Sequence, residues 1–276
     1  FVITAEVIAE EGPRRMSLKR KMNSQRPSEI DPSKFPEICP TKCGCLDVNK
    51  HLQNNKKRYT NMTFDEHFVF SIPKNLNSAG AAPLLCAGIT TYSPLNHWQV
   101  SEGMSVGVIG LGGLGHMAVK FSSALKAKTV VFTTTEKKSE DALRLGADQV
   151  VLSIDEEQMK KETGRFDFIL DTVPVAHDVS RYMPLLKVDG TLCIVGSIGL
   201  TGNLNTRPLI FGRRRITGSL VGGAAETQKM LNFCGEKNIT SDVEIIQIEN
   251  INDAYVRMRE NDVKYRFVID MRKFEN

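Results

Sequence analysis

Three glycines at fixed spacing are the first residues in this sequence whose pattern could do chemistry. Gly110, Gly112 and Gly115 fit the pattern G-x-G-x-x-G, which follows an apolar run at 106–109 and leads into an apolar helical pattern. The first glycine of such a turn permits the tight bend, the second lets backbone amides approach a pyrophosphate, and the third lets helix and strand pack closely. The helix N-terminus then favours the negative charge. We therefore expect a dinucleotide-binding turn rather than an ordinary strand-to-helix connection.

The end of the next expected strand, 129–133, carries the residues that would select the dinucleotide. Three threonines and two lysines lie there: Thr133, Thr134, Thr135, Lys137 and Lys138. An NAD site usually places an acidic residue about 20 positions beyond the glycines to bind the ribose hydroxyls. Hydroxyls and cations suit the 2′-phosphate of NADP instead, so we favour NADP(H). Two alternatives remain: Glu136 could turn inward onto a ribose, or these residues could form a solvated helix start with a threonine N-cap.

An alternation of strand and helix patterns must position these residues. The expected strands are 105–109, 129–133, 149–152, 166–170, 191–195 and 215–221, and the expected helices are 113–125, 137–145, 155–162 and 178–186. This alternation predicts an α/β fold with a doubly wound parallel sheet and helices on both faces. Flanking segments are expected as a strand at 67–72, a buried helix at 79–91, a helix at 224–236, a strand at 243–248, a helix at 251–260 and a strand at 265–270.

The composition is that of an ordinary globular protein. The 276 residues are 41% hydrophobic and 25% charged, which is enough chain for a large core and two domains. The sequence has no run of 18 apolar residues and no signal-peptide pattern, so we expect neither a membrane span nor export. Six cysteines are scattered without a disulfide framework, which favours a reducing, cytoplasmic setting.

The positive charge is concentrated in one N-terminal segment. Residues 1–60 contain 12 Lys and Arg against 7 Asp and Glu, whereas the rest of the chain contains 24 against 25. The segment has little periodic pattern and is rich in Pro, Ser, Asn and Lys. We therefore expect residues 1–57 to be a poorly ordered basic segment. A solvated tail explains such a cluster better than a nucleic-acid or membrane surface, so we expect neither as a partner.

Four stretches together resemble the medium-chain zinc-type alcohol dehydrogenase superfamily, in its cinnamyl alcohol dehydrogenase-like branch. They are residues 81–95, 110–116, 218–223 and 263–270, and the likeness runs from about residue 58 to the C-terminus. The resemblance implies an NADP-binding Rossmann domain at 87–222. It also implies that 58–86 and 223–276 are the remnant of a mostly-β catalytic (GroES-like) domain built from both chain ends, with most of the N-terminal catalytic domain missing.

The resemblance also implies roles for individual residues, matched by position. The implied cofactor contacts are Thr90, Gly110, Leu111, Gly112, Gly113, Leu114, Gly115, Thr133, Thr134, Thr135, Lys137, Lys138, Thr172, Gly196, Ser219, Leu220 and Val221. Cys86 matches the third ligand of the family's catalytic zinc, and so becomes both the metal and the catalytic candidate. Considered alone, a cysteine in a small apolar run is more often a buried hydrophobic residue than a ligand.

The departures from the family pattern concern the zinc. Catalytic zinc needs three protein ligands and an open position, yet the chain has no His-Glu dipeptide and so lacks the family's Gly-His-Glu ligand motif. The segment 42–47 lacks the His and Ser of the Cys-Gly-x-Cys-His-Ser-Asp motif, and Cys39, Cys43 and Cys45 are one ligand short of a structural zinc loop. His51 or His67 could replace a ligand. The sequence thus leaves zinc without its usual ligand set.

The resemblance implies an NADP(H)-dependent oxidoreductase that interconverts aldehydes and primary alcohols, impaired by the loss of zinc ligands. Two alternatives remain open, a catalytically inactive NADP(H)-binding remnant and a zinc-independent reductase. The implied partners are a small aldehyde or alcohol and a second copy of the chain, paired through the sheet edge near 206–221.

Overall fold

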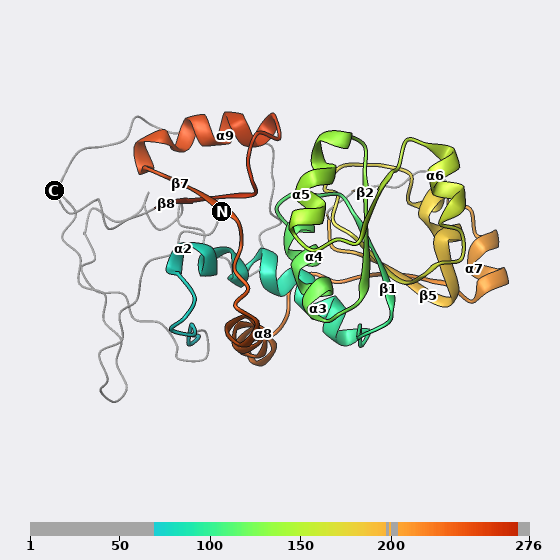
Figure 1. Ribbon diagram of the computed structural model, residues 1–276, viewed down its shortest axis with the longest axis horizontal. Helices are drawn as coiled ribbons and strands as arrows, with labels where there is room; N and C mark the ends of the chain where they lie inside the picture. Colours follow the sequence, from blue (N-terminus) through green and yellow to red (C-terminus); the bar gives the residue numbers. More distant parts are fainter. Residues whose placement is uncertain (1–68, 197–198, 200–203, 270–276) are drawn as a thin grey trace.

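A six-stranded parallel sheet forms the centre of the computed structural model, which describes residues 69–196, 199 and 204–269 (Figure 1). Its strands are β1 (Ser105–Ile109), β2 (Lys128–Thr133), β3 (Gln149–Leu152), β4 (Phe166–Asp171), β5 (Leu186–Ile194) and β6 (Arg215–Gly218). They lie in the order β3-β2-β1-β4-β5-β6, and every neighbouring pair is parallel. The predicted doubly wound α/β fold is therefore confirmed.

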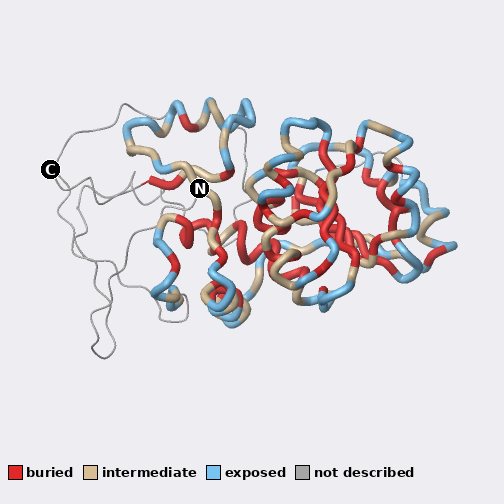
Figure 2. Tube along the Cα trace, viewed as in Figure 1, coloured by how far each residue is buried: buried red, intermediate tan, exposed pale blue. Residues whose placement is uncertain are grey.

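Helices cover both faces of this sheet because its strands are apolar on both sides. One face packs against α3 (Ala87–His97), α4 (Gly115–Ala124) and α5 (Ser139–Arg144), and α8 (Ala224–Lys237) packs on α3. The other face packs against α6 (Glu156–Lys161), the 3₁₀ helix η5 (Val179–Leu185) and α7 (Arg207–Gly212). Figure 2 shows the buried residues concentrated along the sheet. Among the residues described, no helix is both long and apolar enough to cross a bilayer.

A smaller unit lies beside the α4 side of the sheet (Figure 1). It contains two parallel strands, β7 (Val243–Ile246) and β8 (Arg266–Ile269), which pair from Val243 with Arg266 onward. The 3₁₀ helix η6 (Ile248–Asn250) and helix α9 (Ile251–Arg259) connect these strands. The helices α2 (Ser78–Ala81) and η3 (Ala82–Leu85) lead from this unit into α3.

The structure corrects several local predictions. Residues 69–72, the described part of the expected strand 67–72, are not a strand, because the backbone of Ser71 bonds to the Gln228 side chain instead of to a neighbouring strand. The expected helix at 79–91 is divided into α2, η3 and α3, with Pro83 in the first turn of η3. The expected helix at 178–186 is a 3₁₀ helix with Pro184 inside it, and the expected strand 215–221 ends at Gly218. The predicted segment 1–57 lies outside the described residues.

Candidate functional site

The candidate site lies where the strand order of the sheet reverses. Strand β1 has β2 on one side and β4 on the other, and Ile109 pairs with Asp171 at the carboxyl ends of β1 and β4. Ligands of doubly wound sheets bind in the crevice at such a point. The Thr172 hydroxyl donates to the Ile109 carbonyl over 2.7 Å, so the loops that follow β1 and β4 are tied together.

The glycine-rich turn after β1 has the backbone that its sequence predicts. Gly110 has a φ of +86°, a conformation that L side chains rarely adopt. A Cβ at Gly115 would overlap the carbonyl oxygen of Gly110, so the start of α4 can approach β1 only without a side chain there. A Cβ at Gly112 would meet nothing within 4 Å, and Gly112 is exposed. The turn therefore needs glycine at 110 and 115 for its own shape, while the space over Gly112 is open to a ligand.

The turn presents backbone donors to that open space. Among the described residues, the amides of Gly112, Gly113 and Leu114 donate to no backbone acceptor, and the first turn of α4 carries no acidic residue. The Gly112 carbonyl accepts from the His116 amide at 3.0 Å and lies 3.1 Å from the His116 Nδ1. Unpaired amides at a helix N-terminus are the usual donor set for a phosphate group.

Arg266, at the start of β8, is a site residue that the individual assignments from the sequence missed. Its Nε donates to the Gly113 carbonyl over 3.3 Å, across 153 residues of sequence. Burial lowers the pKa of this guanidinium from its usual range, although the nearby Cys86 thiol acts in the opposite direction. Arginine remains charged even so. Of the carboxylates in the described part of the chain, none forms an ion pair with Arg266, so this half-buried cation is available to an anion at the turn. In the sequence, Arg266 lies within the stretch 263–270 that carries the family resemblance, but no motif marked it as a cofactor contact.

The threonines and lysines after β2 lie on the same edge of the sheet as the glycine turn. Thr133 is buried, and its hydroxyl accepts from the Thr135 amide over 3.4 Å. Thr134, Thr135 and Lys137 are exposed and Lys138 is half-buried at η4 (Glu136–Lys138). Thr135 precedes η4 without a side-chain capping bond, so the alternative of a capping threonine is not observed. Thr133 is thus turned toward its own loop, and the other four residues are accessible.

Most of the remaining predicted contacts follow the carboxyl ends of β4, β5 and β6, and Thr90 lies in α3. A Cβ at Gly196 would overlap the Val173 carbonyl, so the loop after β5 touches the Thr172 loop closely. The Ser219 amide donates to the Ile194 carbonyl over 3.1 Å. Leu220 is 69% and Val221 52% exposed. Thr90 is buried in the first turns of α3, and its amide donates to the Cys86 carbonyl over 3.1 Å.

The buried side chain of Asp171 stabilises the loop that contains Thr172. Asp171 is fully buried at the end of β4, and its Oδ1 accepts from the Val173 amide over 3.1 Å. Its Oδ2 lies 3.1 Å from the His177 Nε2. Desolvation raises the pKa of Asp171, and the Val173 amide and His177 oppose that change. Sequence reasoning gave these two residues no role, because an acid and a histidine six positions apart have no motif that marks them.

Cys86 does not form a zinc site with other described residues. It lies half-buried at the junction of η3 and α3, and no group of three His, Cys, Asp or Glu side chains that could hold a metal occurs among residues 69–196, 199 and 204–269. Cys86 lies close enough to the Arg266 guanidinium to influence the pKa of that group, but a guanidinium is not a metal ligand. The other candidate ligands, Cys39, Cys43, Cys45, His51 and His67, lie outside the described residues. The described donor set therefore does not fit zinc.

Comparison with known proteins agrees with this geometry. Residues 113–236 match the family model described as zinc-binding dehydrogenase. The chain is 52% identical over 195 residues to the aldehyde reductase YahK of Escherichia coli (strain K12), which covers 70% of this chain and 56% of that protein. The cinnamyl alcohol dehydrogenase of Sorghum bicolor superposes with a TM-score of 0.74 at 41% identity, covering 77% of this chain and 61% of that one. The chain belongs to the medium-chain zinc-type alcohol dehydrogenase superfamily. Within the superfamily it falls in the cinnamyl alcohol dehydrogenase-like branch.

A second solved relative is a complex with the cofactor NADP(H). It is the CAD of Helicobacter pylori complexed with NADP(H), with a TM-score of 0.70 and 40% identity over 78% of this chain and 61% of that one. The present chain spans about three-fifths of the length of these relatives.

Proposed function

We propose that this chain is the cofactor-binding part of an NADP(H)-dependent oxidoreductase that interconverts aldehydes and primary alcohols. The observation that carries the proposal is the turn after β1. Its amides at Gly112, Gly113 and Leu114 have no described backbone acceptor, and they lie beside the Arg266 cation, which has no carboxylate partner within the described part of the chain. Backbone donors and a guanidinium are the groups that bind a pyrophosphate.

The proposal assigns a task to each part of the site. The turn and Arg266 bind the pyrophosphate, while the adenosine 2′-phosphate lies at four residues with hydroxyl or ammonium groups: Thr134, Thr135, Lys137 and Lys138. The loops with Thr172, Gly196 and Ser219, together with Thr90, orient the nicotinamide half. Bound NADPH supplies a hydride for a carbonyl carbon. The NADP(H) complex of the Helicobacter pylori relative and the aldehyde reductase from Escherichia coli support this assignment.

We also propose that two copies of the chain pair through the β6 edge of the sheet. This edge strand has β5 on one side and no described strand on the other. Large apolar side chains are exposed on α7, the helix that directly precedes β6 in the chain, including Ile210 at 72% and Phe211 at 79%. Exposed apolar residues next to an open strand edge favour association.

Calorimetric titration with NADPH and NADH tests the cofactor assignment. We expect the unmodified chain to bind NADPH more tightly. Replacing Lys137 and Lys138 together with Ala should weaken NADPH binding by about tenfold or more, because each charged hydrogen bond contributes about 1.5–3 kcal/mol. NADH affinity should change less than about twofold, since it lacks the 2′-phosphate. Lys161→Ala, an exposed lysine at the end of α6, is the matched control. Equal affinity of the unmodified chain for both cofactors would contradict the assignment.

NADPH oxidation with a panel of aldehydes, run beside metal analysis, tests the proposed reaction. We expect turnover that depends on an aldehyde. Tight NADPH binding without any turnover would instead support a binding protein without chemistry. Turnover in a metal-free preparation would support the zinc-independent reductase.

A further inference from the structure

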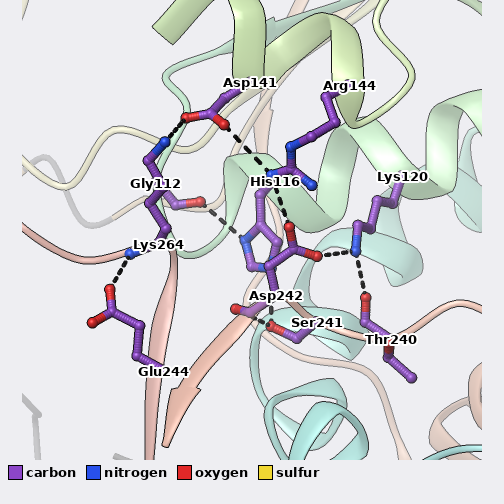
Figure 3. Close-up of polar contacts among 10 residues, drawn as sticks. All are labelled: Gly112, His116, Lys120, Asp141, Arg144, Thr240, Ser241, Asp242, Glu244 and Lys264. Atoms are coloured by element: carbon purple, nitrogen blue, oxygen red, sulfur yellow. Dashed lines mark hydrogen bonds and ion pairs between the residues drawn. The ribbon is translucent and has the colours of Figure 1, made fainter. Parts of the chain in front are cut away.

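His116, the residue directly after the glycine pattern, is completely buried and fully bonded. Its Nδ1 lies 3.1 Å from the Gly112 carbonyl oxygen and its Nε2 lies 2.9 Å from the Ser241 hydroxyl (Figure 3). Its ring stacks on Tyr265, with 4.7 Å between centroids and 12° between planes. One side chain therefore contacts the cofactor turn, the segment before β7 and the residue before β8.

The hydrogen-bond partners of this imidazole determine which ring nitrogen carries the hydrogen. A carbonyl oxygen only accepts, so the Gly112 contact requires hydrogen on Nδ1. The Ser241 hydroxyl also lies 3.3 Å from the Asp242 carbonyl oxygen, but Nε2 is the nearer acceptor at 2.9 Å, so the hydroxyl can donate to Nε2. Burial, the largest influence, lowers the pKa of His116 to about 3. The ring is therefore neutral in one tautomer near neutral pH, which suits a fixed hydrogen-bond donor and not a proton carrier.

The bond to Gly112 determines where the next amide points. The peptide bond is planar and trans, so the Gly113 N–H points away from the Gly112 C=O. The carbonyl is held inward by the amide of His116 and by its ring. The Gly113 N–H therefore points to the opposite side of the peptide from the Gly112 carbonyl. Among the described residues it donates to no backbone acceptor. Arg266 fixes the following peptide in the same way, through the Gly113 carbonyl.

The other end of the imidazole is anchored equally firmly. The Ser241 amide donates to the Gly80 carbonyl over 3.0 Å. Lys120, one turn after His116 on α4, donates to the Thr240 carbonyl over 2.7 Å and pairs with Asp242 (Figure 3). The Ser241 end of the ring therefore cannot shift without breaking the contact between α4 and the segment before β7.

We propose that His116 is a positioning residue for the cofactor: it holds the Gly112–Gly113 peptide with its N–H directed at the pyrophosphate before the cofactor binds. The role rests on the proposed NADP(H) binding, and His116 touches no part of the cofactor itself. Replacement by an apolar residue keeps the backbone bond from residue 116 to Gly112 and removes only the side-chain bonds. The turn then retains its fold, and the Gly112 carbonyl keeps only one of the two bonds that hold it inward.

The test compares NADPH with adenosine 2′-monophosphate, which carries the 2′-phosphate but no pyrophosphate. His116→Leu should weaken NADPH binding about tenfold while the adenosine 2′-monophosphate affinity changes less than about twofold. His116→Asn retains a donor near the Nδ1 position and should recover NADPH affinity to within about threefold of the unmodified chain. Ser241→Ala removes the outer anchor and should weaken NADPH about two- to fivefold, which keeps the test valid if His116→Leu fails to fold.

The outcomes separate the two proposals. An unmodified chain that binds neither ligand overturns the NADP(H) assignment and the positioning role with it. An unmodified chain that binds both, with NADPH affinity unchanged in His116→Leu or in Ser241→Ala, overturns the positioning role alone. Equal losses for both ligands in a folded variant would show that His116 supports the whole domain and does not position the turn.

Discussion

The buried His116 predicts how the stability of the folded chain depends on pH. Its pKa is 6.5 in the unfolded chain and about 3 in the folded one. Because the folded pKa is lowered, the unfolded chain binds an additional proton as pH falls below 6.5, and the folded chain does not. The stability is complete above this pH and is lost toward pH 3. Each pH unit in this window costs about 1.4 kcal/mol, so the loss at about pH 5 is about 2 kcal/mol.

Urea unfolding of the unmodified chain and of His116→Leu, at about pH 7.5 and about pH 5, measures this loss. Other groups with altered pKa, such as Asp171, contribute equally to both proteins, so the comparison cancels them. The unfolding free energy of the unmodified chain should fall by about 2 kcal/mol more than that of the variant. If the two proteins lose stability in parallel, the ring is protonated within the folded chain and the argument from burial is wrong.

Three further predictions follow from the site and the sheet edge. Gly115→Ala should destabilise the fold by several kcal/mol, because its Cβ would overlap the backbone of Gly110. Gly112→Ala should leave the thermal midpoint unchanged and still weaken NADPH binding, because its Cβ would enter the open space over the turn. Scanning calorimetry measures the thermal midpoints and calorimetric titration measures the binding. Arg266→Gln should weaken NADPH binding by about tenfold or more, with adenosine 2′-monophosphate unaffected; a loss for both would place Arg266 outside the pyrophosphate site. Light scattering should give a dimer for the unmodified chain and a monomer for Ile210→Ser with Phe211→Ser, and a monomeric unmodified chain would contradict the pairing.

The sequence predicted the parts of the fold that depend on local pattern. The central strands are apolar runs, and G-x-G-x-x-G with its flanking strand and helix is self-contained within residues 105–124. The prediction from sequence failed where a proline or a contact with a residue far away in the chain determined the local structure. Pro184 favours a 3₁₀ helix at 179–185, and the backbone of Ser71 bonds to the side chain of Gln228. The contacts of Gly113 with Arg266 and of His116 with Ser241 span 153 and 125 residues, which no local pattern encodes.

The contact of β8 with the glycine turn has a consequence for the order in which the site forms during synthesis. The ribosome completes the six strands of the sheet once Gly218 has been added, so the sheet can assemble while later residues are still untranslated. The turn at that moment lacks Ser241, Tyr265 and Arg266, which hold it in the finished protein. A nascent chain that stops before residue 266 would therefore have a folded sheet, but its glycine turn would lack the contacts with Tyr265 and Arg266. The turn therefore acquires its complete set of contacts only after β8 has been made.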